Sequence, residues 1–230
     1  HFRQLFEILE LLGRSYAKNL YHLSYGLVNL PTGRMKSREG TVVDADDLMD
    51  EVSRLAGQEV EKRYPDLAEK EKTKRAEFIA LGALKFFLVR VDPAREMVYN
   101  PEESISFEGE TGPYVQYTHA RACSILRKAK QKITAKVKVQ LLNHPSEERI
   151  ISLLASFPEK TKEAAQQYKP HILCHHLLEL AQAFNEFYHA VPVISEARET
   201  MAARLLLVDS VRQVLENGLA LLGIHAPKEM

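Results

Sequence analysis

A short basic loop contains the first residues that could do chemistry. Between Gly33 and Gly40 the chain places three cations and a hydroxyl group, on Arg34, Lys36, Ser37 and Arg38. Flexible glycines let backbone amides approach a phosphate, and cations offset the charge that builds on a leaving pyrophosphate. A solvated basic turn would have the same composition. Composition alone therefore leaves phosphate chemistry and a plain turn both open.

A second candidate is the helix that is predicted to begin after Thr111. Thr111 is a good N-cap, and Pro113 is tolerated in a first turn because the amides there have no intrahelical partner. At about 100° per residue, rings and cations fall on one narrow arc of this helix, namely Tyr114, Tyr117, Arg121, Ser124 and Lys128. Rings and cations together suit the unstacked bases and phosphates of single-stranded RNA. Alternatively, both tyrosines pack on a neighbouring part of the protein and the cations are solvated.

Other polar features point less clearly to a site. The stretch from Arg127 to Lys138 has six cations and no acid, so it could hold phosphates through counterion release or could be a solvated face. Arg212 shares a helix face with apolar residues, and either buried pairing or snorkelling of its side chain to the surface explains it more simply than contact with a base. In the cluster 171–176, His175 and His176 are adjacent and point to different helix faces, and no fourth ligand lies nearby. No metal is predicted there.

The composition limits the classes of function. The chain has 230 residues, of which 45% are hydrophobic and 27% charged, as in ordinary soluble globular proteins. Because 31 basic residues balance 31 acidic ones, the whole chain has no field that attracts nucleic acid, and any RNA binding must come from local patches. Two cysteines exclude a disulfide framework and favour a reducing compartment. The longest apolar stretch, 78–89, is interrupted by Lys85 and is shorter than the roughly 18 residues that span a bilayer, so no membrane contact is expected.

These candidates must be positioned by a mainly helical chain. The hydrophobic period predicts helices over 4–20, 44–63 and 66–89, a strand over 21–30 and an irregular segment over 91–107. Further helices are predicted over 112–132, 146–156, 159–168, 171–188 and 196–217. Prolines or a glycine separate them, at Pro145, Pro158, Pro170, Pro192 and Gly218. The simplest division lies near Thr111, between a mixed N-terminal part and an all-helical bundle.

The basic loop resembles the second signature loop of class I aminoacyl-tRNA synthetases, usually written K-M-S-K-S. In arginyl-tRNA synthetases this loop commonly has the form K-M-S-x-R-K-G, followed by a valine-rich strand. The positions that agree are Met35, Arg38, Gly40, Val42 and Val43. Arg34, Lys36 and Glu39 depart from the pattern. Arg34 keeps the positive charge of the usual lysine but carries it on a planar guanidinium. Lys36 could supply the compact ammonium charge that this exchange removes.

Three further stretches resemble the same family. The passage 107–121, with Phe107-Glu108-Gly109 and Thr111-Gly112-Pro113-Tyr114-Val115-Gln116-Tyr117, is similar to the entry of the family's helical anticodon-binding domain. Residues 204–230 follow the family's ending down to Met230, and residues 1–6 resemble a piece of its catalytic domain. The resemblance to arginyl-tRNA synthetases therefore extends from one end of the chain to the other.

This resemblance implies a fold and a function. We expect a mainly α chain: a remnant of a Rossmann-type class I catalytic domain with the signature loop (1–43), a helical connecting region (44–111) and an all-helical anticodon-binding bundle (112–230). The implied parent is an arginine–tRNA ligase, which activates arginine with ATP and Mg²⁺ and transfers it to tRNA(Arg). The parent is expected to be a cytoplasmic monomer.

Residue roles follow from the same resemblance. The loop residues expected to act in catalysis are Arg34, Met35, Lys36, Ser37 and Arg38, with Arg34, Lys36 and Ser37 contacting the ATP phosphates. The residues expected to contact tRNA are Tyr114, Tyr117, Arg121, Lys128, Tyr188 and Met230. A stand-alone helical RNA-binding module and a helical protein–protein adaptor are the alternatives. The signature-like loop favours the ligase, because a pure binding module needs no phosphate-cradling segment.

The chain contains no H-I-G-H string, the signature that orients ATP in class I enzymes and that lies upstream of the stretch resembling residues 1–6. We therefore expect these 230 residues alone not to form arginyl-adenylate. An ATP–pyrophosphate exchange assay checks this expectation. Arginine-dependent exchange catalysed by this chain would contradict it.

Overall fold

The fold is seen in a computed structural model of the chain, which describes residues 1–29, 31, 44–129, 137–194 and 197–230. Its helices are α1 (Phe2–Leu11), η1 (Ala17–Asn19), α2 (Ala45–Arg63), α3 (Glu69–Val89), α4 (Pro101–Ser104), α5 (Gly112–Ala129), η3 (Val139–Leu141), α6 (Pro145–Gln167), α7 (Pro170–Ala190) and α8 (Arg198–Leu221). Two short strands, β1 (Val28–Asn29) and β2 (Met97–Val98), pair in parallel. The predicted mainly α fold is confirmed.

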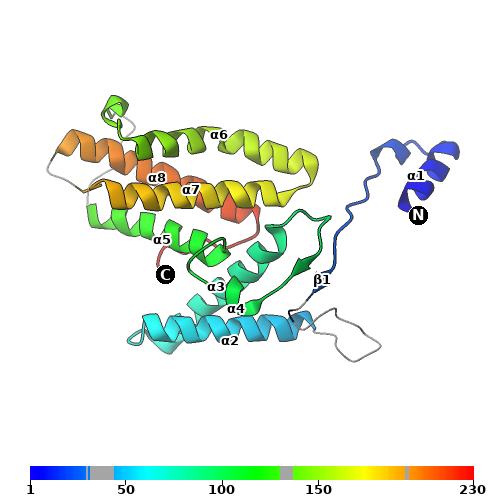
Figure 1. Cartoon of the computed structure of the whole chain (residues 1–230), viewed down its shortest axis with the longest axis horizontal. Helices are drawn as coiled ribbons and strands as arrows, with labels where there is room; N and C mark the ends of the chain where they lie inside the picture. The colour runs from blue at the N-terminus through cyan, green and yellow to red at the C-terminus, as the bar shows by residue number, and fades with distance from the viewer. Residues whose placement is uncertain (30, 32–43, 130–136, 195–196) are drawn as a thin grey trace.

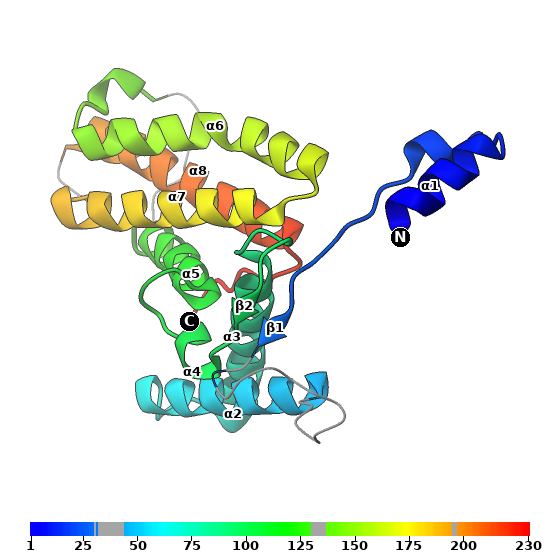
Figure 2. The ribbon, with the colours of Figure 1, turned by 45° about the vertical axis from the view of Figure 1, so that its right-hand side comes forward.

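The elements form a four-helix bundle and a smaller helical layer. Helices α5 to α8 lie side by side in the bundle, and the α2–α3 pair lies beneath it (Figure 1). Helix α1 lies away from both, at the end of an extended segment that reaches β1 (Figure 2). The C-terminal segment after α8 returns to the junction between the bundle and α3. A site at that junction is therefore built from both parts of the chain.

Local sequence signals position several helix starts correctly. Asp44 is the N-cap of α2, with Asp46 and Asp47 in the first turn, although the Asp44 side chain makes no capping hydrogen bond. Acids in this turn interact favourably with the positive end of the helix dipole. At α5 the Thr111 hydroxyl accepts a hydrogen bond from the Tyr114 amide at 3.1 Å. Thr111 thus caps α5, as predicted.

Two predicted elements are shorter in the structure. The helix predicted over 4–20 ends at Leu11, and Gly13 follows with a left-handed φ of 67°. Glycine is favoured in this conformation because it has no Cβ, so this turn ends the helix. Among the described residues of the strand predicted over 21–30, only Val28–Asn29 form a strand, which pairs with the two residues of β2.

Pro158 does not separate two helices. The predicted helices 146–156 and 159–168 form one helix, α6, with Pro158 inside it. An internal proline costs about 3 kcal/mol because it removes a backbone hydrogen bond and crowds the preceding turn. Leu153, Leu154 and Phe157 pack against the bundle core on the same helix. Burial of these side chains before the proline, and of Ala164 after it, outweighs its local cost.

The hydrophobic core has two parts that share α3. The bundle core is centred on buried side chains of α7 and α8 such as Leu177, Phe184 and Val208, and it includes Phe86 of α3. The second core joins α2, α3 and β2, with Val52 and Tyr99 among its members. Because α3 contributes to both cores, the α2–α3 layer is tied to the bundle. The domain borders at 43/44 and 111/112 stay predictions.

Helices α3 and α5 cross where two glycines meet. A Cβ built on Gly112 would overlap the backbone oxygen of Gly82 and would lie 2.8 Å from the Cβ of Phe86. In contrast, a Cβ on Gly57 in α2 would meet no heavy atom within 4 Å. The close approach of α3 and α5 therefore requires glycine at position 112.

We expect Gly112→Ala to lower the free energy of unfolding by about 2 kcal/mol, because backbone atoms must move apart to accept the methyl group. The matched control Gly57→Ala should raise it by about 0.5–1 kcal/mol, because alanine is the better helix former. Urea denaturation of both variants measures the two changes. Equal stability of the two variants would refute the tight crossing.

Candidate nucleic-acid interface

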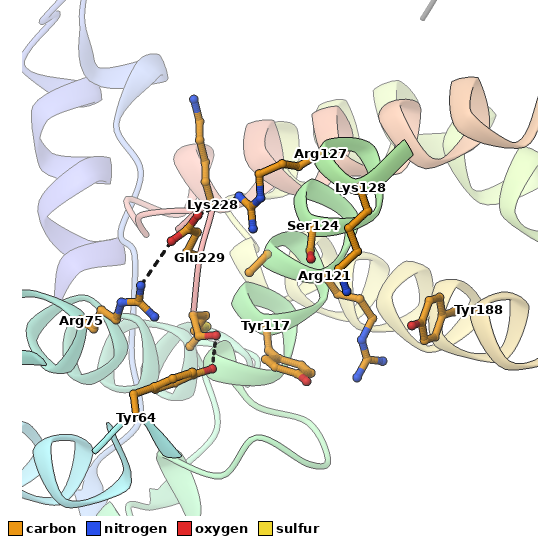
Figure 3. Close-up of a pocket in the computed structure, with 12 residues that line it drawn as sticks. Tyr64, Arg75, Tyr117, Arg121, Ser124, Arg127, Lys128, Tyr188, Lys228 and Glu229 are labelled. Carbon is orange, nitrogen blue, oxygen red and sulfur yellow. Dashed lines mark hydrogen bonds and ion pairs between the residues drawn. The ribbon is translucent and has the colours of Figure 1, made fainter. Parts of the chain in front are cut away.

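A hollow of about 440 Å³ lies between α5, the end of α7, the α2–α3 layer and the C-terminal segment. Figure 3 shows the side chains around it. Five of the six residues predicted to contact tRNA line this hollow: Tyr117, Arg121, Lys128, Tyr188 and Met230. We call it the junction pocket. It brings together residues that are up to 113 positions apart between α5 and the end of the chain.

Tyr114, the sixth predicted contact, lies behind the pocket lining. Its ring is half-buried and packs against the bundle core. Its hydroxyl accepts a hydrogen bond from Nδ2 of Asn185 at 2.9 Å. Asn185 Oδ1 in turn accepts a hydrogen bond from the guanidinium of Arg121. The structure therefore places Tyr114 where it supports Arg121, and its contact with tRNA stays a prediction.

Arg121 forms a cluster of one cation and two rings with two tyrosines, which we call the platform. Its guanidinium carbon lies 4.8 Å from the ring centre of Tyr117 and 5.2 Å from that of Tyr188. Tyr117 and Arg121 are four residues apart and so share one face of α5, while Tyr188 comes from the end of α7. Cation–π attraction holds the charge at the rings. Rings and guanidinium planes of this kind are the surfaces on which proteins stack unpaired bases.

The junction pocket is positively charged although the chain as a whole is neutral. Among the described residues that line it, five are cationic and only Glu229 is acidic. The cations are Arg75, Arg121, Arg127, Lys128 and Lys228. Arg127 and Lys128 begin the predicted cationic run, whereas Lys138 near its end pairs with Glu199 at 2.8 Å. Residues 130–136 of that run lie outside the described residues. The excess of cations suits a polyanion.

The C-terminal segment is held against α3 and α5 mainly through its backbone. Nζ of Lys85 donates to the carbonyl of Gly223 at 2.7 Å, and Nε2 of Gln116 donates to the carbonyl of His225 at 2.8 Å. Nδ1 of His119 lies 2.8 Å from the carbonyl of Pro227. The hydroxyl of Tyr64 donates to the carbonyl of Met230. These bonds bring the last residues of the chain to the pocket.

Sequence analysis missed several of the lining residues, among them Glu229 and three that carry a ring or a positive charge. Tyr64 lies at the end of α2, Arg75 in the charged first half of α3 and Lys228 in the C-terminal segment. No periodicity connects them to the arc on α5, because their approach depends on how α3 crosses α5. Arg75 also lies over the ring of Tyr64, 5.2 Å from its centre. A second ring–cation pair is thus present at the far side of the pocket.

Two family models cover nearly all of the chain. The DALR anticodon binding domain matches residues 115–230, and the catalytic domain of class I (R) tRNA synthetases matches residues 1–100. The chain belongs to the arginyl-tRNA synthetase family. The junction pocket, apart from its α2–α3 side, lies within the anticodon-binding match.

Individual relatives agree with this family. The arginine–tRNA ligases of Flavobacterium psychrophilum and Treponema pallidum are 43% and 44% identical to the chain over its full length, which covers 38% and 40% of those proteins. Thermus thermophilus arginyl-tRNA synthetase superposes with a TM-score of 0.85 at 37% identity, over 96% of this chain and 38% of that one. The synthetase of Plasmodium falciparum has a TM-score of 0.75 at 20% identity and shows the fold alone. The chain spans about two fifths of the length of these curated relatives.

The loop that resembles the family's signature lies in the part of the chain that the structure leaves undescribed. The predicted catalytic residues Arg34, Met35, Lys36, Ser37 and Arg38 all fall within residues 32–43, outside the described residues. Their contacts with ATP phosphates stay predictions. The helix that follows the loop, α2, begins where the sequence placed it.

The histidine cluster and Arg212 behave as structural residues. His176 is buried and His175 is exposed, so the two point to different faces, as predicted. Within the described ranges, no three His, Cys, Asp or Glu side chains are placed to hold a metal ion. Burial raises the pKa of the Cys174 thiol to about 12. Arg212 pairs with Asp209 and Glu216 at 2.8 and 2.7 Å, which confirms pairing within the protein.

The described helices also bear on whether the chain crosses a membrane. None of them combines the length and the apolar character that crossing a bilayer requires.

His119 makes the anchoring of the C-terminal segment sensitive to pH. Burial lowers the pKa of its fully buried imidazole, while the bond to the Pro227 carbonyl and the charge of Glu216 oppose that shift, and Arg212 and His225 add to it. Below about pH 6.5 the unfolded chain therefore binds a proton that the folded chain does not, so stability falls as the pH falls.

We expect His119→Asn to reduce this loss of stability between pH 7 and pH 5. The asparagine amide keeps a donor near the position of Nδ1 and does not titrate. Urea denaturation at both pH values measures the change. His171 and His176 also have lowered pKa values, so part of the pH dependence of stability will remain in this variant. If the free energy of unfolding fell between pH 7 and pH 5 as much as in the unchanged chain, the role of His119 would be contradicted.

Proposed function

We propose that this chain is the tRNA-recognising part of an arginine–tRNA ligase and that the junction pocket binds the anticodon loop of tRNA(Arg). The observation that supports this most directly is the guanidinium of Arg121 between the rings of Tyr117 and Tyr188, in a pocket lined by cations. It lies on the domain whose family model is named for anticodon binding.

Each part of the pocket has a separate task in this proposal. The platform of Tyr117, Arg121 and Tyr188 stacks unpaired bases, which requires a loop in which bases are already turned outward. Lys128 and Lys228, at the rim, hold backbone phosphates and make binding weaken as salt concentration rises. Met230, on a backbone fixed by Tyr64, limits the space available to a base.

The parent enzyme would use the remaining predicted residues in the chemical step. Arginine's carboxylate attacks the α-phosphate of ATP, giving arginyl-adenylate and pyrophosphate. A ribose hydroxyl of tRNA then attacks the arginyl carbonyl and accepts the arginyl group, and AMP leaves. The loop's donor set, three cations and a hydroxyl between glycines, fits a triphosphate carrying Mg²⁺. Arg34, Lys36 and Ser37 would hold the phosphates, and Arg38 with Met35 would complete the loop. Their task is electrostatic stabilisation of the leaving pyrophosphate.

The proposal also includes the arrangement of the parent protein. Residues 1–43 would complete its catalytic domain, residues 44–111 would connect, and residues 112–230 would bind tRNA, in a cytoplasmic monomer. A stand-alone RNA-binding module and an adaptor are less consistent with the findings, because residues 1–100 match a catalytic-domain model.

We expect Tyr188→Ala to weaken binding of a tRNA(Arg) transcript by roughly 5- to 150-fold, because loss of one stacked base costs about 1–3 kcal/mol. Tyr188 is 43% exposed, so its removal should leave folding intact. The control Tyr16→Ala removes a ring that is 53% exposed and lies outside the pocket. Fluorescence anisotropy with labelled tRNA measures both.

Specificity for the anticodon is a separate expectation. In competition, unlabelled tRNA(Arg) should displace the probe at lower concentration than a tRNA with an unrelated anticodon, and Tyr188→Ala should reduce this difference. Equal affinity for the two tRNAs would count against anticodon recognition. Unchanged binding by Tyr188→Ala would remove the junction pocket from the interface.

A further inference from the structure

Glu229 is the acidic exception among the described residues that line the junction pocket. One of its carboxylate oxygens lies 2.8 Å from Arg127 on α5, and the other lies 3.4 Å from Arg75 on α3. Figure 3 shows Arg75 directed toward it across the pocket. The carboxylate thus bridges two cations that come from the two layers of the fold.

Glu229 is the acidic partner that these two arginines share. Among the ion pairs of the described residues, Arg75 and Arg127 each pair only with Glu229. Arg75 is 17% exposed at its side chain, and Arg127 is 55% exposed. Two guanidinium groups that face one pair of oxygens from different sides are also suited to the oxygens of a phosphate.

The side chain of Glu229 can leave without loosening the C-terminal segment. Its carboxylate belongs to a residue that is 56% exposed, so a change of rotamer moves it into water. The neighbouring backbone is held independently by Gln116, His119 and Tyr64, through the carbonyls of residues 225, 227 and 230. The ion pairs of Glu229 are therefore not needed to keep the segment in place.

We propose that Arg75 and Arg127 form a phosphate subsite of the RNA interface, which the carboxylate of Glu229 occupies until an RNA phosphate displaces it. The proposal rests on the function proposed above, because it needs RNA in the junction pocket. Glu229 keeps the two arginines oriented and competes with the incoming phosphate. Ion pairs with an exposed carboxylate are weak. A backbone phosphodiester, which carries the same single negative charge, can therefore displace this carboxylate when the rest of the RNA is already held in the pocket.

The test replaces the charge and keeps the shape. With Glu229→Gln, tRNA(Arg) should bind roughly three- to tenfold more tightly, because the phosphate no longer displaces a carboxylate. Glu186→Gln is the matched control: Glu186 is 58% exposed, pairs with Arg149 of another helix at 2.6 Å and lies outside the pocket. It loses the same unit of negative charge and should change affinity less than twofold.

A second substitution shows whether the gain passes through the arginines. Arg127→Gln should weaken tRNA binding several-fold. When Glu229→Gln is added to Arg127→Gln, the increase in affinity should be less than half of the increase that Glu229→Gln causes in the unchanged chain. Anisotropy at one fixed salt concentration measures all variants, and thermal unfolding shows that each is folded. These linked changes would establish the subsite.

The outcomes separate this inference from the proposed function. If Tyr188→Ala weakens tRNA binding but Glu229→Gln binds no better than Glu186→Gln, the subsite is wrong and the proposed function stands. Weaker binding by Glu229→Gln would mean that the ion pairs of Glu229 are needed to hold the pocket in shape, and it would also overturn the subsite. If Tyr188→Ala changes nothing, the proposed function fails, and this inference fails with it.

Discussion

The buried amide of Gln116 joins the three segments on which the pocket depends. Its Nε2 donates to the carbonyl of Phe78 in α3 at 3.1 Å and to that of His225 in the C-terminal segment at 2.8 Å. The residue is completely buried in α5, and its Oε1 has no partner among the described residues. Leaving this buried oxygen unpaired costs roughly 1–3 kcal/mol. The two hydrogen bonds that Nε2 donates are strong, because the buried site has a low dielectric constant. The geometry of α3, α5 and the segment is thereby fixed.

The glycine crossing makes this junction possible. Because Gly112 lies against the backbone of Gly82, the axes of α3 and α5 come close enough for the side chain of Gln116 to reach a carbonyl of α3. The same approach brings Arg75 within ion-pair distance of a residue that also contacts Arg127. Cations and rings that are distant in sequence therefore surround one cavity.

Charge in this molecule is organised locally. The net charge is zero, yet the described lining of the junction pocket combines five cations with one carboxylate. Elsewhere cations pair closely, as Arg204 does with the buried Glu147 at 2.7 Å, a contact that links α8 to the first turn of α6. Pairing in the bundle fixes helices to one another, while the five pocket cations share, among the described residues, a single lining carboxylate, that of Glu229. The positive potential is therefore concentrated at the pocket, although the net charge of the chain is zero.

The sequence by itself determined the helical fold, the helix starts at Asp44 and Thr111, the family, and the arc on α5 that contributes Tyr117, Arg121 and Lys128 to the pocket. These properties depend on capping and on period, which act over a few residues. Only the tertiary structure decided that Pro158 stays inside one helix and that Tyr114 turns toward Asn185. It also decided that Tyr64 and Arg75 join the site. The reason is physical: packing against α7 and the close crossing of α3 and α5 involve residues far apart in sequence, and no local pattern encodes their distance.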